Sequence, residues 1–343
     1  MTDIQRPHEQ IVRDNLTTGM VLGKFLPPTL GHRYLIDFAR SWCDRLTVIL
    51  GSLRREPVPG EQRVKWLNEM FPDVRVLHLT DENPQYPSEH PDFWQIWHDS
   101  IRRIMPEGPD LVFASEEYGF KLAGILGASY IPVDTPRELV PVNATMVRES
   151  PMEHWQWIPE CVRPWFVKKV CIIGPESTGK TTLARRLARE FGTRCVAEYA
   201  RGYIETHNGQ VTPEMFPLFV KGQRASEEAM SRQANRILFC DTDHFTTALY
   251  HELYVGDRPE WIVREADSRL YDLYLLCSHE GTPYMEESQR QHPEMREWFF
   301  EPCLRRLSQR GEQHIILTGS LEERFGQACR AVTALLQAPV PQC

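Results

Sequence analysis

The sequence lacks the features that mark membrane, secreted and zinc-binding proteins. No segment reaches the roughly 18 consecutive apolar residues of a membrane-spanning helix, and the opening MTDIQRPHEQIVRDN contains no apolar core of a secretory signal. The nine cysteines form no C-x-x-C pair, and the twelve histidines show no short recurring spacing. We therefore expect no membrane partner and no structural metal site.

Acidic residues outnumber basic ones, with 47 Asp and Glu against 39 Lys and Arg. The formal net charge is -8, which disfavours a nucleic-acid-binding surface because phosphate backbones require concentrated Lys and Arg. Cys171, Cys240 and Cys277 lie inside apolar strand-like runs, where a reduced thiol behaves as a small hydrophobe. These observations predict a cytoplasmic globular protein without nucleic-acid partners.

The length and the apolar pattern predict two α/β domains. A chain of 343 residues exceeds the roughly 250 to 300 residues at which single cores stop growing. Apolar strand-like runs alternate with helical patterns at residues 19–25, 45–50, 110–114 and 129–133, and again at 169–174, 236–241, 272–277 and 313–319. Such alternation is typical of mainly parallel sheets. We predict domains at 18–150 and 169–337, joined by a proline-interrupted linker at 151–168.

The second half opens with a phosphate-binding loop. GPESTGKT, residues 174–181, matches G-x-x-x-x-G-K-[ST] and stands between a strand-like run and a helical pattern. We expect the Lys180 amine to neutralise phosphate charge as a catalytic group and Thr181 to bind Mg²⁺. The candidate ATP-binding residues of this half are Gly174, Ser177, Thr178, Gly179, Lys180, Thr181 and Thr182.

Acidic and aromatic residues near the same predicted sheet edge extend this site. Asp241 and Asp243 end an apolar run. We assign Asp241 to the metal and Asp243 to accepting a substrate proton, although the roles can exchange and both can simply terminate a strand or cap a helix. Glu198, Tyr199 and Arg201 are candidates for the acceptor pocket, with surface and packing roles as the alternative. Because a small-molecule kinase and an ATPase both need such a phosphate-binding loop, the second half alone does not distinguish between these two functions.

The first half contains a second strand–turn–helix phosphate motif. Gly23, Lys24 and Phe25 follow an apolar run, and Thr29 and His32 stand where a helix begins. Main-chain amides at such a helix N-terminus bind anions. A capping threonine with a packed histidine would explain the tetrapeptide TLGH equally well.

These residues resemble the nucleotidyltransferase signature G-x-F-x-P-x-[HT]-x-G-H. The matches are Gly23, Phe25, Pro27, Thr29, Gly31 and His32. A second signature, close to I-S-x-T-x-x-R, is matched in VNATMVR by Thr145 and Arg148, while Asn143 replaces the serine. Together with the later P-loop, the order resembles the NadR-type bifunctional nicotinamide-nucleotide adenylyltransferase and ribosylnicotinamide kinase, over about residues 18–336.

The resemblance implies a Rossmann-like nucleotidyltransferase domain followed by a P-loop kinase domain. The second half would phosphorylate nicotinamide riboside to the mononucleotide NMN, using ATP and Mg²⁺. The first half would join NMN to AMP from a second ATP, giving NAD and pyrophosphate. Lys24, His32 and Arg148 suit stabilisation of the charge that develops at phosphorus.

The resemblance also assigns binding residues. For ATP in the first half it implies Gly23, Phe25, Thr29, Gly31, Ser115, Glu116 and Thr145. Trp94 and Trp97 would contact the mononucleotide, because an aromatic face suits a cationic pyridinium ring, although core packing explains them equally well. In a lid-like segment, Tyr284 would stack on nicotinamide, and Arg290 would close on the phosphates as a catalytic group.

Two alternative functions and several properties stay open. The chain can instead be a nucleotide- and NAD-sensing regulator with little turnover, or retain only one active half. Some relatives carry an N-terminal helix-turn-helix, but the roughly 18 residues before the first strand are too few for it, so we expect no DNA binding. Assembly into a homo-oligomer, amide or acid substrate preference and transfer of product between sites are not decided by the sequence.

Overall fold

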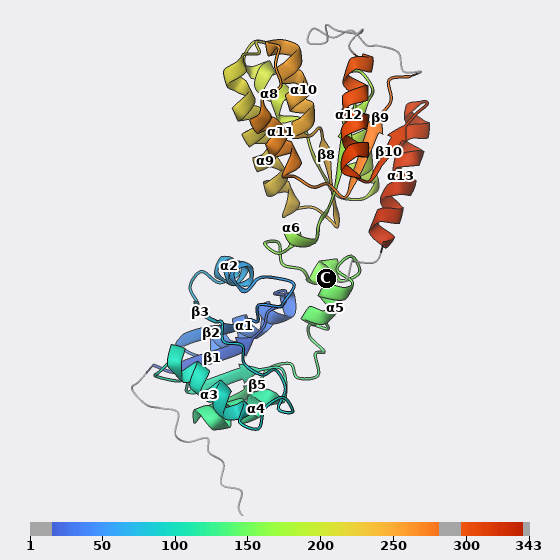
Figure 1. The fold of residues 1–343 in the computed structure, drawn as a ribbon. Helices are drawn as coiled ribbons and strands as arrows, with labels where there is room; N and C mark the ends of the chain where they lie inside the picture. Colours follow the sequence, from blue (N-terminus) through green and yellow to red (C-terminus); the bar gives the residue numbers. More distant parts are fainter. Residues whose placement is uncertain (1–15, 281–295, 339–343) are drawn as a thin grey trace, which may run out of the picture. The chain divides into compact units, whose positions relative to one another are not determined.

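Two units divide the chain between Val162 and Arg163. The structure is a computed structural model and describes residues 16–280 and 296–338 (Figure 1). The division falls inside the segment 151–168, and Trp155 and Ile158 of that segment are buried residues that belong to the first unit. Each unit contains its own five-stranded sheet, so each is described by itself.

The first unit is built on a parallel sheet with the order β3-β2-β1-β4-β5. Its strands are β1 (Thr18–Gly23), β2 (Arg45–Gly51), β3 (Arg75–Leu79), β4 (Leu111–Ala114) and β5 (Ser129–Pro132). The predicted runs account for all of these except β3. As an edge strand with the sequence RVLHL, β3 is only half buried and lacks a continuous apolar run.

Helices cover both faces of this sheet. They are α1 (Leu30–Trp42), α2 (Gly60–Met70), α3 (Phe93–Ile104), α4 (Tyr118–Leu126) and α5 (Ala144–Glu149), with a 3₁₀ turn η1 at Trp155–Trp157. Successive strand residues point to opposite faces: Val21 packs in a cluster with α1 and α2, whereas Met20 packs with α3 and α4. The two clusters make the strands apolar on both sides.

The second unit repeats this architecture with the strand order β10-β9-β6-β8-β7, again all parallel. Its strands are β6 (Lys168–Ile173), β7 (Arg194–Val196), β8 (Ile237–Asp241), β9 (Leu273–Cys277) and β10 (His314–Leu317). The predicted α/β class with mainly parallel sheets is thus confirmed for both halves of the chain.

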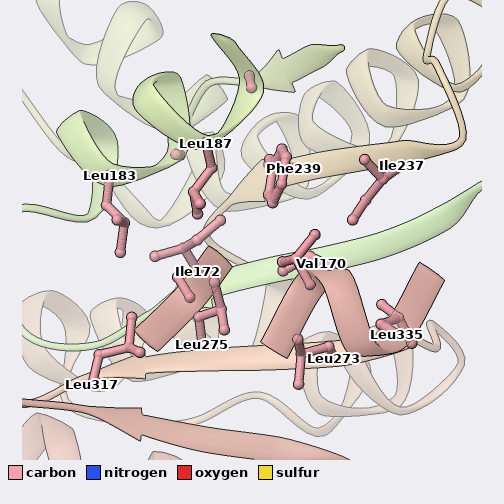
Figure 2. Packing of buried hydrophobic residues seen from close by; sticks show 14 of the residues in the cluster. Val170, Ile172, Leu183, Leu187, Ile237, Phe239, Leu273, Leu275, Leu317 and Leu335 are labelled. Atoms are coloured by element: carbon pink, nitrogen blue, oxygen red, sulfur yellow. The ribbon is translucent and has the colours of Figure 1, made fainter. Parts of the chain in front are cut away.

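The helices of the second unit lie on two sides of its sheet. They are α6 (Arg163–Phe166), α7 (Lys180–Glu190), α8 (Tyr199–Thr206), α9 (Phe216–Ser231), α10 (His244–Val255), α11 (Glu260–Asp267), α12 (Arg296–Arg310) and α13 (Leu321–Gln337), with a 3₁₀ turn η2 at Pro213–Met215. Leu183 and Leu187 of α7 meet Val170, Ile172 and other strand residues in one apolar cluster (Figure 2). This cluster anchors the helix that follows the P-loop.

The strand order determines where ligands can bind. In each unit the first strand, β1 or β6, lies in the middle of the sheet, and the chain continues to opposite sides of it. Ligands of open α/β sheets bind at the carboxyl ends of the strands, where the order reverses. Both loops that sequence analysis singled out follow these central strands.

None of the helices in residues 16–280 and 296–338 combines the length and apolar character needed to cross a bilayer.

Gly174 permits the turn from β6 into the P-loop. Its φ is 138°, a conformation that residues with a Cβ rarely adopt. A Cβ atom at this position would lie 2.5 Å from the carbonyl oxygen of Cys277 on β9. The loop therefore passes directly over the neighbouring strand, and its path depends on the missing side chain.

Gly174→Ala is expected to lower the free energy of unfolding of the second unit by about 2 kcal/mol or more, from backbone strain and the contact with Cys277. The matched control is Gly202→Ala, because Gly202 lies within α8 and a Cβ there meets nothing within 4 Å. That control should be neutral or stabilising by about 0.5 to 1 kcal/mol. Urea denaturation of the two variants measures the difference, and equal stabilities would contradict the loop geometry.

Candidate functional site

A cavity of about 750 Å³ opens at the carboxyl ends of the first sheet's strands. Every site residue predicted for the first half lines it: Gly23, Lys24, Phe25, Thr29, Gly31, His32, Trp94, Trp97, Ser115, Glu116, Thr145 and Arg148. The size lies within the usual range for small-molecule and cofactor sites. Residues from four segments of sequence therefore meet in one place.

Thr29 and His32 form a capping box at the start of α1. The Thr29 amide donates to Nδ1 of His32 at 3.0 Å, and the Thr29 hydroxyl accepts from the His32 amide at 3.4 Å. Because Nδ1 accepts this bond, the neutral ring carries its proton on Nε2. Burial, with a contribution from the charge of Arg137, lowers the pKa of His32 to about 4. His32 is thus a neutral hydrogen-bond donor at physiological pH.

Lys24 is held by a buried ion pair, between Glu56 and Arg63, that no sequence motif predicts. Arg63 is fully buried and donates to the Lys24 carbonyl at 2.7 Å and to Oε2 of Glu56 at 2.6 Å. Glu56 Oε1 lies 3.3 Å from the Lys24 amine. Burial would raise the pKa of Glu56, but bonds from the Leu53 amide and Arg63 and the nearby positive charges hold it below its usual value.

The second signature forms another part of the cavity wall. Asn143 caps α5 by accepting from the Met146 amide at 2.8 Å, so the residue that replaces serine has a local structural role. Arg148 donates to the Leu26 carbonyl at 2.8 Å and to the Thr145 hydroxyl at 3.3 Å. Arg148 therefore joins this helix to the loop after β1.

The remaining predicted residues of this cavity come from α3 and the end of β4. Trp94 and Trp97 are half-buried and pack against the α3–α4 cluster while also lining the cavity. The indole of Trp97 donates to the Pro84 carbonyl at 2.9 Å. Packing and ligand contact, which were alternatives in the sequence, are both open to these two side chains. Glu116 is exposed and pairs with Arg137 at 2.8 Å.

A second cavity, of about 1160 Å³, lies at the carboxyl ends of the second sheet. The predicted residues that line it are Ser177, Thr178, Gly179, Lys180, Thr181, Thr182, Glu198 and Arg201. The Lys180 amine donates to the Pro175 carbonyl at 2.9 Å, and the Thr178 hydroxyl donates to the same oxygen at 2.8 Å. These two bonds connect the end of the P-loop to its beginning, and they hold the Lys180 side chain at the cavity wall.

Thr181 and Asp241 meet beneath this loop. The Thr181 hydroxyl donates to Asp241 Oδ2 at 2.5 Å. Asp241 is buried, and its Oδ1 atom has no hydrogen-bond partner among the described residues. A hydroxyl beside an unpartnered carboxylate oxygen fits the hard oxygen donors that Mg²⁺ prefers. No group of three or more His, Cys, Asp and Glu within the described chain could hold a metal by itself, so phosphate oxygens would complete the set.

Asp243, to which the sequence analysis gave either the substrate proton or a capping role, caps the helix α10. Its Oδ1 atom accepts from the Thr246 amide at 2.8 Å and from the Thr246 hydroxyl at 2.7 Å, which caps α10. Oδ2 lies 4.0 Å from the Arg306 guanidinium. Asp243 does not line the cavity. The structure therefore shows the capping aspartate that was the alternative in the sequence.

Glu198 lies where an acceptor hydroxyl could reach it. It lines the cavity, its side chain is 18% exposed, and it lies 3.6 Å from Arg201. Its carboxylate makes no capping bond to α8. Burial and the nearby Asp241 carboxylate raise the pKa of Glu198. The positive charges of Lys180 and Arg201 lower it, but the net effect is a raised pKa.

Three other predicted residues of this half are not in the cavity wall, and two cannot be placed. Gly174 lies against Cys277, and Asp241 is bonded to the lining residue Thr181. Tyr199 packs on α9, where a Cβ atom at Gly222 would lie 2.2 Å from its ring. Tyr284 and Arg290 lie outside the described residues.

Sequence reasoning missed several residues that shape the two cavities. Glu56 and Arg63 lie beside Lys24 only after α2 packs on the sheet, and Arg137 reaches the first cavity from the loop after β5. In the second cavity, Gln223 is buried and accepts from the Tyr199 amide at 3.0 Å, and Tyr250 donates to Glu176 at 3.3 Å. None of these has a motif, because each depends on contacts between distant segments.

Known proteins share this arrangement over nearly the whole chain. A family model described as an AAA domain matches residues 169–324. The trifunctional NAD biosynthesis/regulator protein NadR of Escherichia coli (strain K12) is 30% identical over 299 residues, covering 81% of this chain and 72% of the relative. The protein of the same name from Salmonella typhimurium (strain LT2) is 29% identical over 293 residues, covering 79% of this chain and 71% of the relative.

Two solved structures agree with the fold. A crystal structure of a NadR protein in complex with NAD and AMP-PNP is 25% identical, with a TM-score of 0.77 and coverage of 96% of this chain and 98% of that one. A crystal structure of a NadR protein in complex with NR is 26% identical, with a TM-score of 0.79 and coverage of 95% and 98%. The resemblance indicated by the two sets of motifs is confirmed.

The His32 ring is expected to stay neutral as the pH falls from 8 to 5.5 in the ligand-free protein, because its pKa is lowered to about 4. An unfolded histidine titrates near 6.5. The native state therefore binds fewer protons than the unfolded state between these values, and this group makes the free energy of unfolding fall as the pH drops from about 6.5 to about 4. NMR titration, with His32→Ala to assign the signal, measures the pKa. A midpoint near 6.5 would contradict the geometry.

Proposed function

This chain belongs to the NadR family of nucleotide-binding proteins of NAD biosynthesis, and we propose that it is a bifunctional NAD salvage enzyme. It phosphorylates nicotinamide riboside to NMN with ATP, and it transfers the adenylyl group of ATP to NMN to give NAD and pyrophosphate. The observation that carries the proposal is the presence of two separate cavities, each with main-chain turns and cationic side chains at the carboxyl ends of its own sheet.

The first cavity suits adenylyl transfer without a covalent enzyme intermediate. A phosphate oxygen of NMN attacks the α-phosphorus of ATP, the α–β bond breaks, and its electron pair leaves with pyrophosphate. The enzyme's task is to hold the reactants in line and stabilise the charge on phosphate oxygens. In our proposal Nε2–H of His32, the Lys24 amine and the Arg148 guanidinium supply that stabilisation, and the half-buried faces of Trp94 and Trp97 bind the pyridinium ring.

The second cavity suits phosphoryl transfer to a hydroxyl group. Lys180 and the loop amides bind the β- and γ-phosphates, and Lys180 leaves the Pro175 carbonyl to do so. Thr181 and Asp241 would hold Mg²⁺, which would supply positive charge to neutralise part of the phosphate charge. Arg201 lines the same cavity and would orient the acceptor.

We assign the base of the kinase reaction to Glu198 in place of Asp243. Glu198 lines the cavity and makes no capping bond, and the charge of the nearby Lys180 contributes to its pKa. A carboxylate whose pKa is raised accepts a proton more readily than an ordinary one at neutral pH. Both acceptor bonds of Asp243 Oδ1 are already used by Thr246, and its other oxygen faces Arg306.

Lys180→Ala is expected to lower NMN formation from nicotinamide riboside by at least about a hundredfold while leaving NAD formation from supplied NMN intact, because only the kinase cavity loses its cation. His32→Ala should do the reverse. Chromatography of products from each substrate, with Mg²⁺ and ATP, measures both reactions. Tight NAD binding without any product from the unmodified protein would favour a sensor. Loss of both reactions in either folded variant would contradict the division of labour.

Glu198→Gln is expected to lower the kinase kcat by about 10²- to 10⁴-fold, the usual contribution of a general base. Asp243→Asn should retain most turnover, because asparagine also caps helices well. The unmodified kinase should lose activity as the pH falls through the raised pKa of Glu198, since only the ionised carboxylate accepts a proton. Single-turnover rates across pH 4.5 to 8 measure this acidic limb. An Asp243→Asn enzyme as impaired as Glu198→Gln would reverse the assignment.

A further inference from the structure

Arg137 brings a third cationic side chain to the first cavity, beside Lys24 and Arg148. It lies in the segment between β5 and α5, lines the cavity, and pairs with Glu116 at 2.8 Å. Its charge also contributes to the low pKa of His32, which lines the same cavity. No motif of the sequence included it.

The segment that carries Arg137 is held in a specific shape. Asp134 and Arg137 have φ values of 45° and 55°, in the left-handed region that residues with side chains rarely adopt. The Arg137 amide donates to the Asp134 carbonyl at 2.8 Å. The Asp134 carboxylate accepts from the amides of residues 138, 139 and 140, at 3.0 to 3.3 Å. Strain of this kind persists only where surrounding bonds enforce it, and it is concentrated at ligand-binding segments.

The three cations differ in how firmly their partners hold them. Lys24 faces a carboxylate that is 6% exposed, and Arg148 donates to the Leu26 carbonyl and to Thr145. Among the residues that the structure describes, Glu116 is the carboxylate paired with Arg137, and its side chain is 60% exposed. An ion pair this close to water is weak. Arg137 can therefore exchange Glu116 for a stronger anion.

We propose that Arg137 leaves Glu116 to bind the polyphosphate of ATP, and that it stabilises the pyrophosphate released during adenylyl transfer. Glu116 is then the counter-charge of the ligand-free cavity, and Asp134 is a positioning residue that fixes the segment. This inference rests on the proposed adenylyltransferase function. A planar guanidinium can give two parallel hydrogen bonds to phosphate oxygens, which a lysine cannot.

The experiment measures NAD formation from NMN, ATP and Mg²⁺ by the full chain. Arg137→Ala should lower kcat/KM for ATP by about 10²- to 10³-fold, the usual effect of removing one donor to a developing charge, with little change in KM for NMN. Arg137→Lys should recover part of the loss, because the charge returns without the second hydrogen bond. Inorganic pyrophosphate should inhibit Arg137→Ala at least about tenfold more weakly than the unmodified enzyme.

The two carboxylates give opposite expectations. Glu116→Gln should lower KM for ATP, because Arg137 no longer has to leave a charged partner. Asp134→Ala should reproduce the loss of kcat/KM for ATP expected for Arg137→Ala, whereas Asp134→Asn, which keeps one acceptor oxygen, should retain part of the activity. A merely structural role for this segment would lower thermal stability without weakening pyrophosphate inhibition.

Two controls separate this inference from the proposed function. Arg75→Ala removes an exposed arginine that pairs with Glu107 away from the cavity, and should leave the kinetics unchanged. Thermal denaturation of the same variants reports whether the first unit is folded, and phosphorylation of nicotinamide riboside reports the same for the second unit. If the unmodified protein forms no NAD, the proposed function fails. If it forms NAD and Arg137→Ala matches it in kcat, KM for ATP and pyrophosphate inhibition, the role of Arg137 is overturned.

Discussion

Both units depend on one constraint: the chain must turn from a buried central strand into a helix whose N-terminal amides face the cavity. In the first unit the turn ends in the capping box of Thr29 and His32. In the second it passes over β9 at Gly174, where no Cβ would fit. The helices are fixed by apolar clusters on the sheet. Because the amides are rigidly placed, they can attract phosphate without reorganising when the ligand arrives.

The cations around these turns are placed but not fully neutralised. Lys24 is guided by the Glu56–Arg63 pair, Lys180 rests on a loop carbonyl, and Arg137 has an exposed partner. A cation in a fully buried ion pair would contribute little to the free energy of ligand binding, because the pair would have to be broken first. Partners of moderate strength keep each side chain in position while leaving it able to move to a phosphate oxygen.

The sequence predicted those parts of the molecule that local patterns determine. Continuous apolar runs located the buried strands, and motif spacing located both loops, because strand, turn and helix follow one another in the chain. The edge strand β3 was missed because half of its surface faces water. The sequence allowed Asp243 either a chemical role or a capping role, and nothing in DTD alone distinguishes these. The bond to Thr246 becomes visible only in the structure. Glu56, Arg63 and Arg137 could not be found, since their positions depend on packing between distant segments.

The central claim is that each unit holds its own nucleoside triphosphate. Equilibrium titration of the full chain with AMP-PNP and Mg²⁺ tests it most directly, because this analogue resists transfer of its γ-phosphoryl group. The account predicts two molecules bound per chain, with Lys180→Ala and His32→Ala each weakening a different one. A single binding event per chain, abolished by either substitution, would contradict it.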